Sequence, residues 1–322
     1  RTAKLPPRNP QSKYSAVVVF GDSYSDDEHR QSEPVKNPYK ALARIGQNST
    51  GILWPNILVK EMYPGSTPKL YDYAYNAAHA NNHLTTWGMH IPDTRAEIQE
   101  YLSDVANGKI SGGGGDIIYI WWIGINPIDA IWIDACDPTI AGAKHARYPT
   151  DALFVNATNR ISLQVEEVRF QVQSLRAKVI ANSRRASFMI VTVPNIDVAP
   201  YQNRLVQKWA GNDKDQQEDI LKLLRLLIKQ YNEGLQKAIK SIRDKNGEAK
   251  GFIRTYDIVL LWKDILNTPE KYGIKNVTTS CFRNNVVCTN VKEYFFWDSL
   301  HPTPSVETIF AHDMNRFISD QR

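Results

Sequence analysis

The sequence predicts an α/β fold, a three-layer α/β/α sandwich around a five-stranded, mostly parallel sheet of the flavodoxin-like type. Five short apolar runs alternate along the chain with segments of helical periodicity. The first run, residues 16–20, is β-branched and aromatic and stops at Gly21, as buried strands of parallel sheets do. Polar residues follow the first and third runs, so we expect functional side chains at the carboxyl edge of the sheet.

Each element follows from a local pattern. The predicted strands are residues 16–20, 70–74, 116–123, 187–193 and 252–256. The predicted helices are residues 54–62, 93–107, 151–181, a segment from Asp213 or Asp215 to Asn246, 258–266 and 304–318. Thr303 before Pro304 is typical of a helix start, because Pro suits the first helical position. Residues 26–50 and 128–151 have no clear period and are predicted to be long loops.

Two segments at opposite ends of the chain carry a candidate nucleophilic site. Ser23 directly follows the first predicted strand, and Asp298 and His301 lie three residues apart near the C-terminus. A serine hydroxyl needs a base to take its proton, and that base needs a third group to hold its tautomer. Asp298 can orient His301, which can then serve Ser23. The alternative is that Gly21, Asp22 and Ser23 are ordinary turn residues.

Four short blocks in the chain resemble those of the GDSL, or SGNH, hydrolases. They are Gly-Asp-Ser-Tyr at 21–24, the segment 73–82, Gly-Ile-Asn-Pro at 124–127 and Asp-Ser-Leu-His-Pro at 298–302. The set is most similar to secreted fungal acetylesterases, carbohydrate esterase family 16. The resemblance implies one SGNH-hydrolase domain over residues 1–322, with residues 1–13 as an extended N-terminal segment, and no cofactor.

The resemblance also implies a role for individual residues. Ser23, His301 and Asp298 would be catalytic, and the oxyanion hole would consist of the Ser23 and Ala77 amide groups and the Asn126 side chain. Two residues depart from the family pattern, which has Gly at the position of Ala77 and Asp at that of Pro127. A methyl group at Ala77 opposes a positive φ angle, and Pro127 removes an acid that supports the loop.

His79, His83 and His90 raise the alternative of a metal site, because His79 and His83 stand four residues apart. No acidic residue lies between them as in a zinc-protease helix, and the resemblance implies no metal. We expect these histidines in a loop or a pocket wall. Trp132 is open to two interpretations, the wall of a sugar or acyl pocket or the hydrophobic core.

Charge and hydropathy exclude other classes of protein. The net charge of +5 arises from 39 basic and 34 acidic residues with no long basic block, which argues against nucleic-acid binding. No stretch approaches the ~20 apolar residues of a transmembrane helix. The expected partner is a small-molecule or oligosaccharide ester.

Several features favour secretion. Asn48, Asn156 and Asn276 begin glycosylation sequons, and residues 1–13 look like the start of a processed chain. Cys281 and Cys288 are close enough in sequence to form a disulfide, which leaves Cys136 over. The alternatives are another pairing through Cys136, or three reduced cysteines in the cytosol.

These observations together predict a secreted serine esterase, and the resemblance implies that it removes acetyl groups from fragments of hemicellulose. A lysophospholipase or short-chain lipase is an alternative with the same chemistry. A carbohydrate-binding protein that has kept the fold and lost catalysis is an alternative from another class, which the substitutions at Ala77 and Pro127 leave room for.

Overall fold

The computed structural model describes residues 14–27, 53–62, 68–88, 90–110, 115–140, 152–181, 185–246 and 251–321. Its central sheet has five parallel strands in the order β2-β1-β3-β4-β5. The strands are β1(Tyr14–Gly21), β2(Lys69–Asp72), β3(Asp116–Trp122), β4(Ala186–Val191) and β5(Ile253–Tyr256). This is the flavodoxin-like order of doubly wound sheets, and it confirms the predicted fold class.

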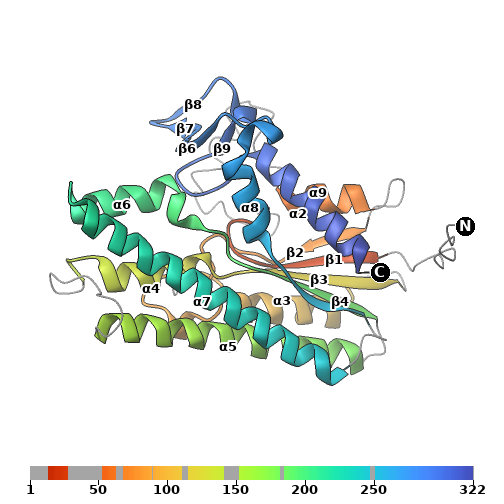
Figure 1. The fold of residues 1–322 in the computed structure, drawn as a ribbon. Coiled ribbons are helices and arrows are strands. Elements are labelled where there is room, and N and C mark those ends of the chain that lie inside the picture. Colours follow the sequence, from red (N-terminus) through yellow and green to blue (C-terminus); the bar gives the residue numbers. More distant parts are fainter. Residues whose placement is uncertain are drawn as a thin grey trace, which may run out of the picture.

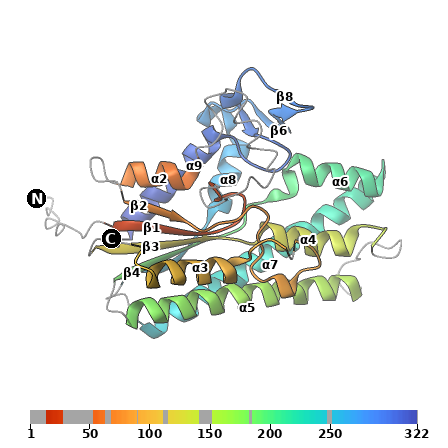
Figure 2. The same ribbon diagram turned by 180° about the vertical axis from the view of Figure 1, so that it is seen from behind.

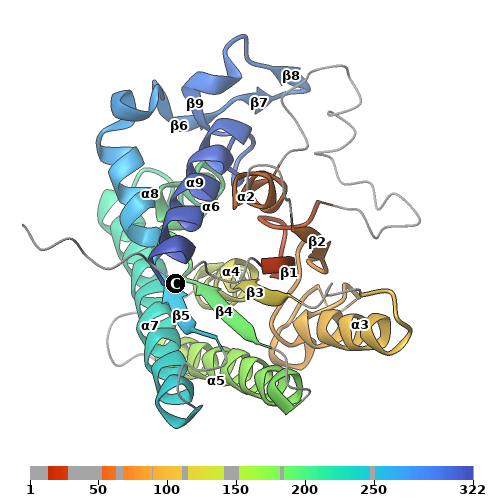
Figure 3. The ribbon, with the colours of Figure 1, turned by 90° about the vertical axis from the view of Figure 1, so that its right-hand side faces the viewer.

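Eight α-helices of the described residues surround this sheet. They are α2(Trp54–Met62), α3(Thr94–Ala106), α4(Ile125–Cys136), α5(Ala152–Ala181), α6(Pro200–Ala210), α7(Lys214–Asn246), α8(Ile258–Asn267) and α9(Pro304–Asp320). Helices α2, α8 and α9 cover one face of the sheet, and α3, α5 and α7 cover the other (Figures 1 and 3). The described residues also contain four short 3₁₀ turns, η1(Asn82–Leu84), η2(Ile196–Val198), η3(Pro269–Tyr272) and η4(Val291–Glu293).

Apolar side chains from both ends of the chain form the core between these layers. Val17, Val18 and Phe20 of β1 are fully buried, because β1 lies inside the sheet and is covered on both faces. One continuous hydrophobic cluster runs from Tyr14 to Ile318. Among the described residues, no helix is both long and apolar enough to cross a bilayer.

The prediction of a loop over residues 128–151 is wrong for its first part, because α4 extends to Cys136. Ten of its twelve residues are buried. A helix buried on nearly all sides shows no amphipathic period, which hid it in the sequence. Pro127 is tolerated because it lies in the first helical turn, where amide groups have no intrahelical partner. Helix α6 was likewise not predicted; it leaves the same end of the sheet as α4 (Figure 2).

A small group of short paired strands beyond α8 supports the segment around His301. It contains β6(Asn276–Ser280) paired with β9(Tyr294–Phe296), and a hairpin of β7(Phe282–Arg283) and β8(Val286–Val287). The disulfide Cys281–Cys288 is present, which confirms the predicted pairing, and Cys136 lies buried at the end of α4. The Cys281 amide donates to the Phe296 carbonyl at 2.9 Å. The disulfide-closed loop is therefore attached directly to the strand that leads to His301.

Candidate active site

The turn that presents Ser23 begins where β1 ends. A Cβ atom at Gly21 would lie 2.3 Å from the Trp122 carbonyl oxygen, so the close approach of β1 and β3 requires glycine there. The amide groups of Ser25 and Asp26 both donate to the Asp22 carbonyl, at 2.9 and 3.0 Å. These bonds reverse the chain immediately after the strand and leave Ser23 on the rim of the sheet.

Ser23, His301 and Asp298 lie in one hydrogen-bonded chain, although Ser23 and His301 are 278 residues apart. His301 Nε2 is 2.8 Å from Ser23 Oγ, and His301 Nδ1 is 2.9 Å from Asp298 Oδ2. Asp298 Oδ1 accepts the amide groups of Leu300 and His301 at 2.7 and 2.8 Å, which closes the turn. A proton on Nδ1 is held by the carboxylate, so Nε2 faces the serine hydroxyl as an acceptor.

His301 and Asp298 each favour the charged form of the other. Burial, the largest influence, lowers the pKa of His301, but the charge and hydrogen bond of Asp298 and the charge of Asp22 outweigh it, so the pKa lies above its ordinary value. Burial alone would raise the pKa of Asp298, but the charge of His301 and three hydrogen bonds lower it below its ordinary value. Asp298 is therefore ionised at neutral pH.

Asp22 and Tyr24 hold the nucleophile turn against the histidine loop. Asp22 is fully buried, and Oδ1 accepts the Tyr24 amide at 3.1 Å. Burial raises the pKa of Asp22 to about 7, even though that bond and the charge of His301 lower it. The Tyr24 hydroxyl donates to the Leu300 carbonyl at 2.8 Å. One turn of the chain thus carries Ser23 and also fixes the loop of its base.

Carboxylates that the sequence analysis did not single out tie the neighbouring loops to this turn. Glu97 of α3 accepts the Gly21 amide at 2.9 Å, and Asp26 accepts the Asn76 amide at 2.7 Å. Burial raises the pKa of Glu97 well above its ordinary value. Its position on the face of α3 that also carries Ile98 and Tyr101 was the available signal, since a carboxylate in a core-facing row needs a local partner.

Asn126 and Ala77 lie in the two segments that flank this turn. Asn126 is in the first turn of α4, directly after β3, and its side-chain amide donates to the Ala78 carbonyl at 3.0 Å. An amide nitrogen carries two hydrogens, so one is left for another acceptor. Among the described residues, the backbone amides of Ser23 and Ala77 donate no hydrogen bond. The N-terminus of α4 adds a partial positive charge beside them.

Ala77 adopts the conformation that its methyl group opposes, with a φ angle of 64°. We expect Ala77→Gly to raise the free energy of unfolding by about 0.5–1 kcal/mol. The left-handed conformation costs an alanine about 1–2 kcal/mol, while glycine adds about 0.4–1 kcal/mol of unfolded-state entropy. Denaturant unfolding measures the difference. Ala78→Gly is the control. It should lose stability, since Ala78 is buried and does not have a positive φ angle. A less stable Ala77→Gly variant would contradict the argument.

The three histidines do not come together. His79 is fully buried and its ring contacts Trp87 edge-on at 5.1 Å between centroids, whereas His83 is exposed. Burial lowers the pKa of His79 to about 4. No group of three possible metal ligands is found within the described part of the chain. The pair four residues apart is therefore split between the interior and the surface.

The remaining predicted positions that the structure describes lie on α4, α5 and β6. Asn156 is exposed on α5 and Asn276 is partly exposed on β6, while Asn48 lies outside the described residues. Trp132 belongs to the core, where it is fully buried and its indole donates to the Ile220 carbonyl at 2.9 Å.

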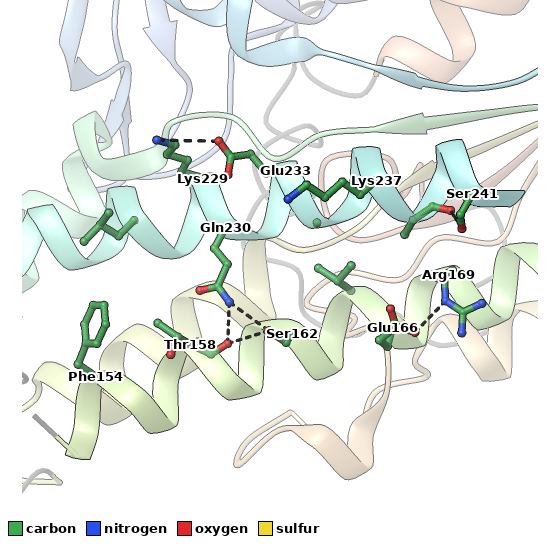
Figure 4. A pocket seen from close by; sticks show the side chains of 14 residues that line it. Phe154, Thr158, Ser162, Glu166, Arg169, Lys229, Gln230, Glu233, Lys237 and Ser241 are labelled. Carbon is green, nitrogen blue, oxygen red and sulfur yellow. Dashed lines mark hydrogen bonds and ion pairs between the residues drawn. The ribbon is translucent and has the colours of Figure 1, made fainter. Parts of the chain in front are cut away.

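A separate hollow of about 710 Å³ lies between α5 and α7 (Figure 4). Polar side chains cross it, and the Gln230 amide donates to the Thr158 carbonyl at 2.9 Å and to Ser162 Oγ at 3.1 Å. Arg169 pairs with Glu166 on the same helix at 2.8 Å. These groups bind one another and come from mid-helix positions, so we assign the hollow no chemistry.

Comparisons with known proteins identify a family that the chain matches. The family model described as GDSL-like Lipase/Acylhydrolase matches residues 17–314. Three GDSL esterase/lipases of Arabidopsis thaliana are similar over shorter stretches, with 31% identity over 100 residues, 32% over 96 and 26% over 141. These stretches cover 26%, 26% and 39% of this chain and 28%, 26% and 34% of the relatives. The chain thus matches about a third or less of each relative's length.

Proposed function

The chain belongs to the GDSL-like lipase and acylhydrolase family, and we propose that it is a serine esterase that removes short acyl groups, acetyl above all, from hydroxylated alcohols such as hemicellulose-derived oligosaccharides. The hydrogen-bonded chain from Ser23 through His301 to Asp298 carries this proposal. The preference for acetyl esters rests on the resemblance of the four sequence blocks to fungal acetylesterases.

The mechanism follows from the directions of these bonds. His301 Nε2 takes the proton of Ser23 as Oγ attacks the ester carbonyl carbon, and the imidazolium is stabilised by ionised Asp298. The carbonyl oxygen becomes negative and is held by the amides of Ser23 and Ala77 and by Asn126, each such donor being worth about 3–4 kcal/mol. His301 then protonates the alcohol oxygen as the C–O bond breaks.

Hydrolysis of the acyl-enzyme repeats these steps with water. His301 takes a proton from water, the hydroxide attacks the acyl carbon, and Ser23 Oγ leaves with the proton that His301 returns. The chain's own residues supply the nucleophile, the base and the oxyanion donors. The ester and water are the reactants.

A fluorophosphonate probe and a panel of esters test the proposal together. The probe should label Ser23 in the folded protein, because only an activated serine reacts. The panel contains 4-nitrophenyl esters of rising chain length, acetylated xylo-oligosaccharides and lysophosphatidylcholine, and we expect activity to fall as the acyl chain lengthens. Preference for lysophosphatidylcholine would favour a lysophospholipase. Folded protein that resists labelling and still binds oligosaccharide would favour a binding protein.

Two accompanying proposals concern the whole chain. We propose that residues 1–322 form one domain, which the continuous core from Tyr14 to Ile318 supports. We also propose that the protein is secreted, which the Cys281–Cys288 disulfide and the exposed Asn156 sequon support. Glycosidase-sensitive mass at Asn156 in protein recovered from culture medium tests the second proposal.

A further inference from the structure

A buried polar pair joins the N-terminal parts of α4 and α6. The Gln202 side-chain amide donates to Asp129 Oδ1 at 3.1 Å; Asp129 is 5% exposed and Gln202 is fully covered. Burial raises the pKa of Asp129 to about 7, against the lowering effect of this bond. A carboxyl group in such surroundings is costly unless its oxygens have partners. Packing alone therefore does not explain why this pair is present.

Each member of the pair is close in the chain to a residue that contacts or belongs to the candidate active site. Asp129 follows Asn126 by three residues, so both side chains leave the same side of α4. Tyr201, next to Gln202, donates its amide to the Ser299 carbonyl at 2.8 Å, and Ser299 stands between Asp298 and His301. Helices α4 and α6 extend from the same end of the sheet (Figures 1 and 2). The pair thus connects the oxyanion helix with the loop of the base.

This group of side chains has hydrogen-bonding capacity left over. Gln202 Oε1 is buried and accepts no hydrogen bond from the described residues. Within that part of the chain, Asp129 Oδ2 and the Tyr201 hydroxyl form no hydrogen bond either, and unlike Gln202 Oε1 neither atom is fully covered. Tyr201 is half-buried, and Arg204 stands 5.5 Å from the centre of its ring. Because polar atoms with little access to water are nearly always paired in native proteins, a hydroxylated ligand would supply the missing partners of the Asp129 carboxyl and the Tyr201 hydroxyl.

We propose that Asp129, held in place by Gln202, and Tyr201 bind the alcohol part of the ester and select alcohols that carry a free hydroxyl next to the esterified one, such as glycerol and sugars. The inference rests on the proposed function and names the feature of the substrate that this site selects. We place the alcohol part of the ester at this site because His301 must protonate the departing alcohol oxygen. Tyr201 donates a hydrogen bond to the loop that carries His301. The Asp129 carboxyl oxygen accepts from a hydroxyl group, and the Tyr201 phenol can donate to one.

Two acetate esters of equal chain length isolate this effect. Propyl acetate and 2,3-dihydroxypropyl acetate share the acyl group and differ only in two hydroxyls on the alcohol. We expect the wild-type protein to show a kcat/KM about 10-fold or more higher for the dihydroxy ester, the size of one hydrogen bond to a charged group. Asp129→Asn should lower kcat/KM for the dihydroxy ester more than for propyl acetate and so remove most of that preference. Tyr201→Phe should reduce the preference several-fold.

The control is Asp134→Asn on the same helix, which removes the bond of Asp134 to Arg160 away from the pair and should preserve the preference. A wild-type protein with equal kcat/KM for the two esters would overturn the inference. An equal loss of kcat/KM on both esters in Asp129→Asn would also overturn it. Such a loss would indicate that the Asp129–Gln202 bond serves only to hold α4 and α6 together. Failure of the proposed function looks different, because wild-type protein would then hydrolyse neither ester and resist the fluorophosphonate probe.

Discussion

Ser23→Ala is expected to lower kcat/KM for a short acetyl ester by about 10⁴-fold or more, because removing the nucleophile of such a triad leaves only oxyanion binding and substrate positioning. The melting temperature should stay within a few degrees of wild type. Ser23 is partly exposed, and among the described residues its hydroxyl forms one hydrogen bond, to His301 Nε2. Initial rates with 4-nitrophenyl acetate and a thermal melt of the same preparation measure both quantities.

Ser25→Ala is the matched control for this loss. Ser25 lies two residues further along the same turn, it is fully buried, and its hydroxyl has no hydrogen-bond partner among the described residues. Its backbone amide, which donates to the Asp22 carbonyl, is unchanged by the substitution. We expect activity close to wild type in this variant. Near-normal turnover in Ser23→Ala, with Ser25→Ala equally active, would refute the assignment of the nucleophile.

Asp298→Asn is expected to lower kcat/KM by about 10- to 1,000-fold. In serine proteases with a Ser-His-Asp triad the same change costs about 10⁴ in kcat, because the amide stabilises the wrong histidine tautomer. We expect a smaller loss here because the Asn oxygen can still accept the Leu300 and His301 amides, which Asp298 now binds at 2.7 and 2.8 Å. The turn should therefore keep His301 near Ser23. Steady-state kinetics with a short acetyl ester measure the loss.

The pH dependence of the two proteins should differ in a definite direction. His301 must be neutral to accept the serine proton, so kcat/KM rises as pH increases through its pKa. Burial lowers that pKa, but Asp298 and Asp22 raise it more, so the rising limb of the wild type should lie above pH 6.5. Asp298→Asn removes the larger raising influence and leaves burial, so its limb should move to lower pH. An unchanged limb and unchanged kcat/KM would show that Asp298 does not orient His301.

Local patterns in the sequence were enough to identify the sheet and the residues of the candidate triad. Buried strands show as continuous apolar runs, and β1 and β3 were found because each run stops at a polar or glycine residue at its carboxyl end. Asp298 and His301 are three residues apart, so a single turn brings them together, and no distant contact has to be known. The Cys281–Cys288 pairing is local for the same reason.

Contacts between distant segments, in contrast, were decided only by the tertiary structure. Helix α4 was hidden because a helix buried on nearly all sides has no polar face from which a period could be read. The Glu97 bond to Gly21 and the Asp129 bond to Gln202 join residues 76 and 73 positions apart, and no local spacing predicts such pairs. The positive φ of Ala77 also depends on its neighbours, because the sequence alone favours the ordinary conformation for alanine and only the packed loops hold it in the other.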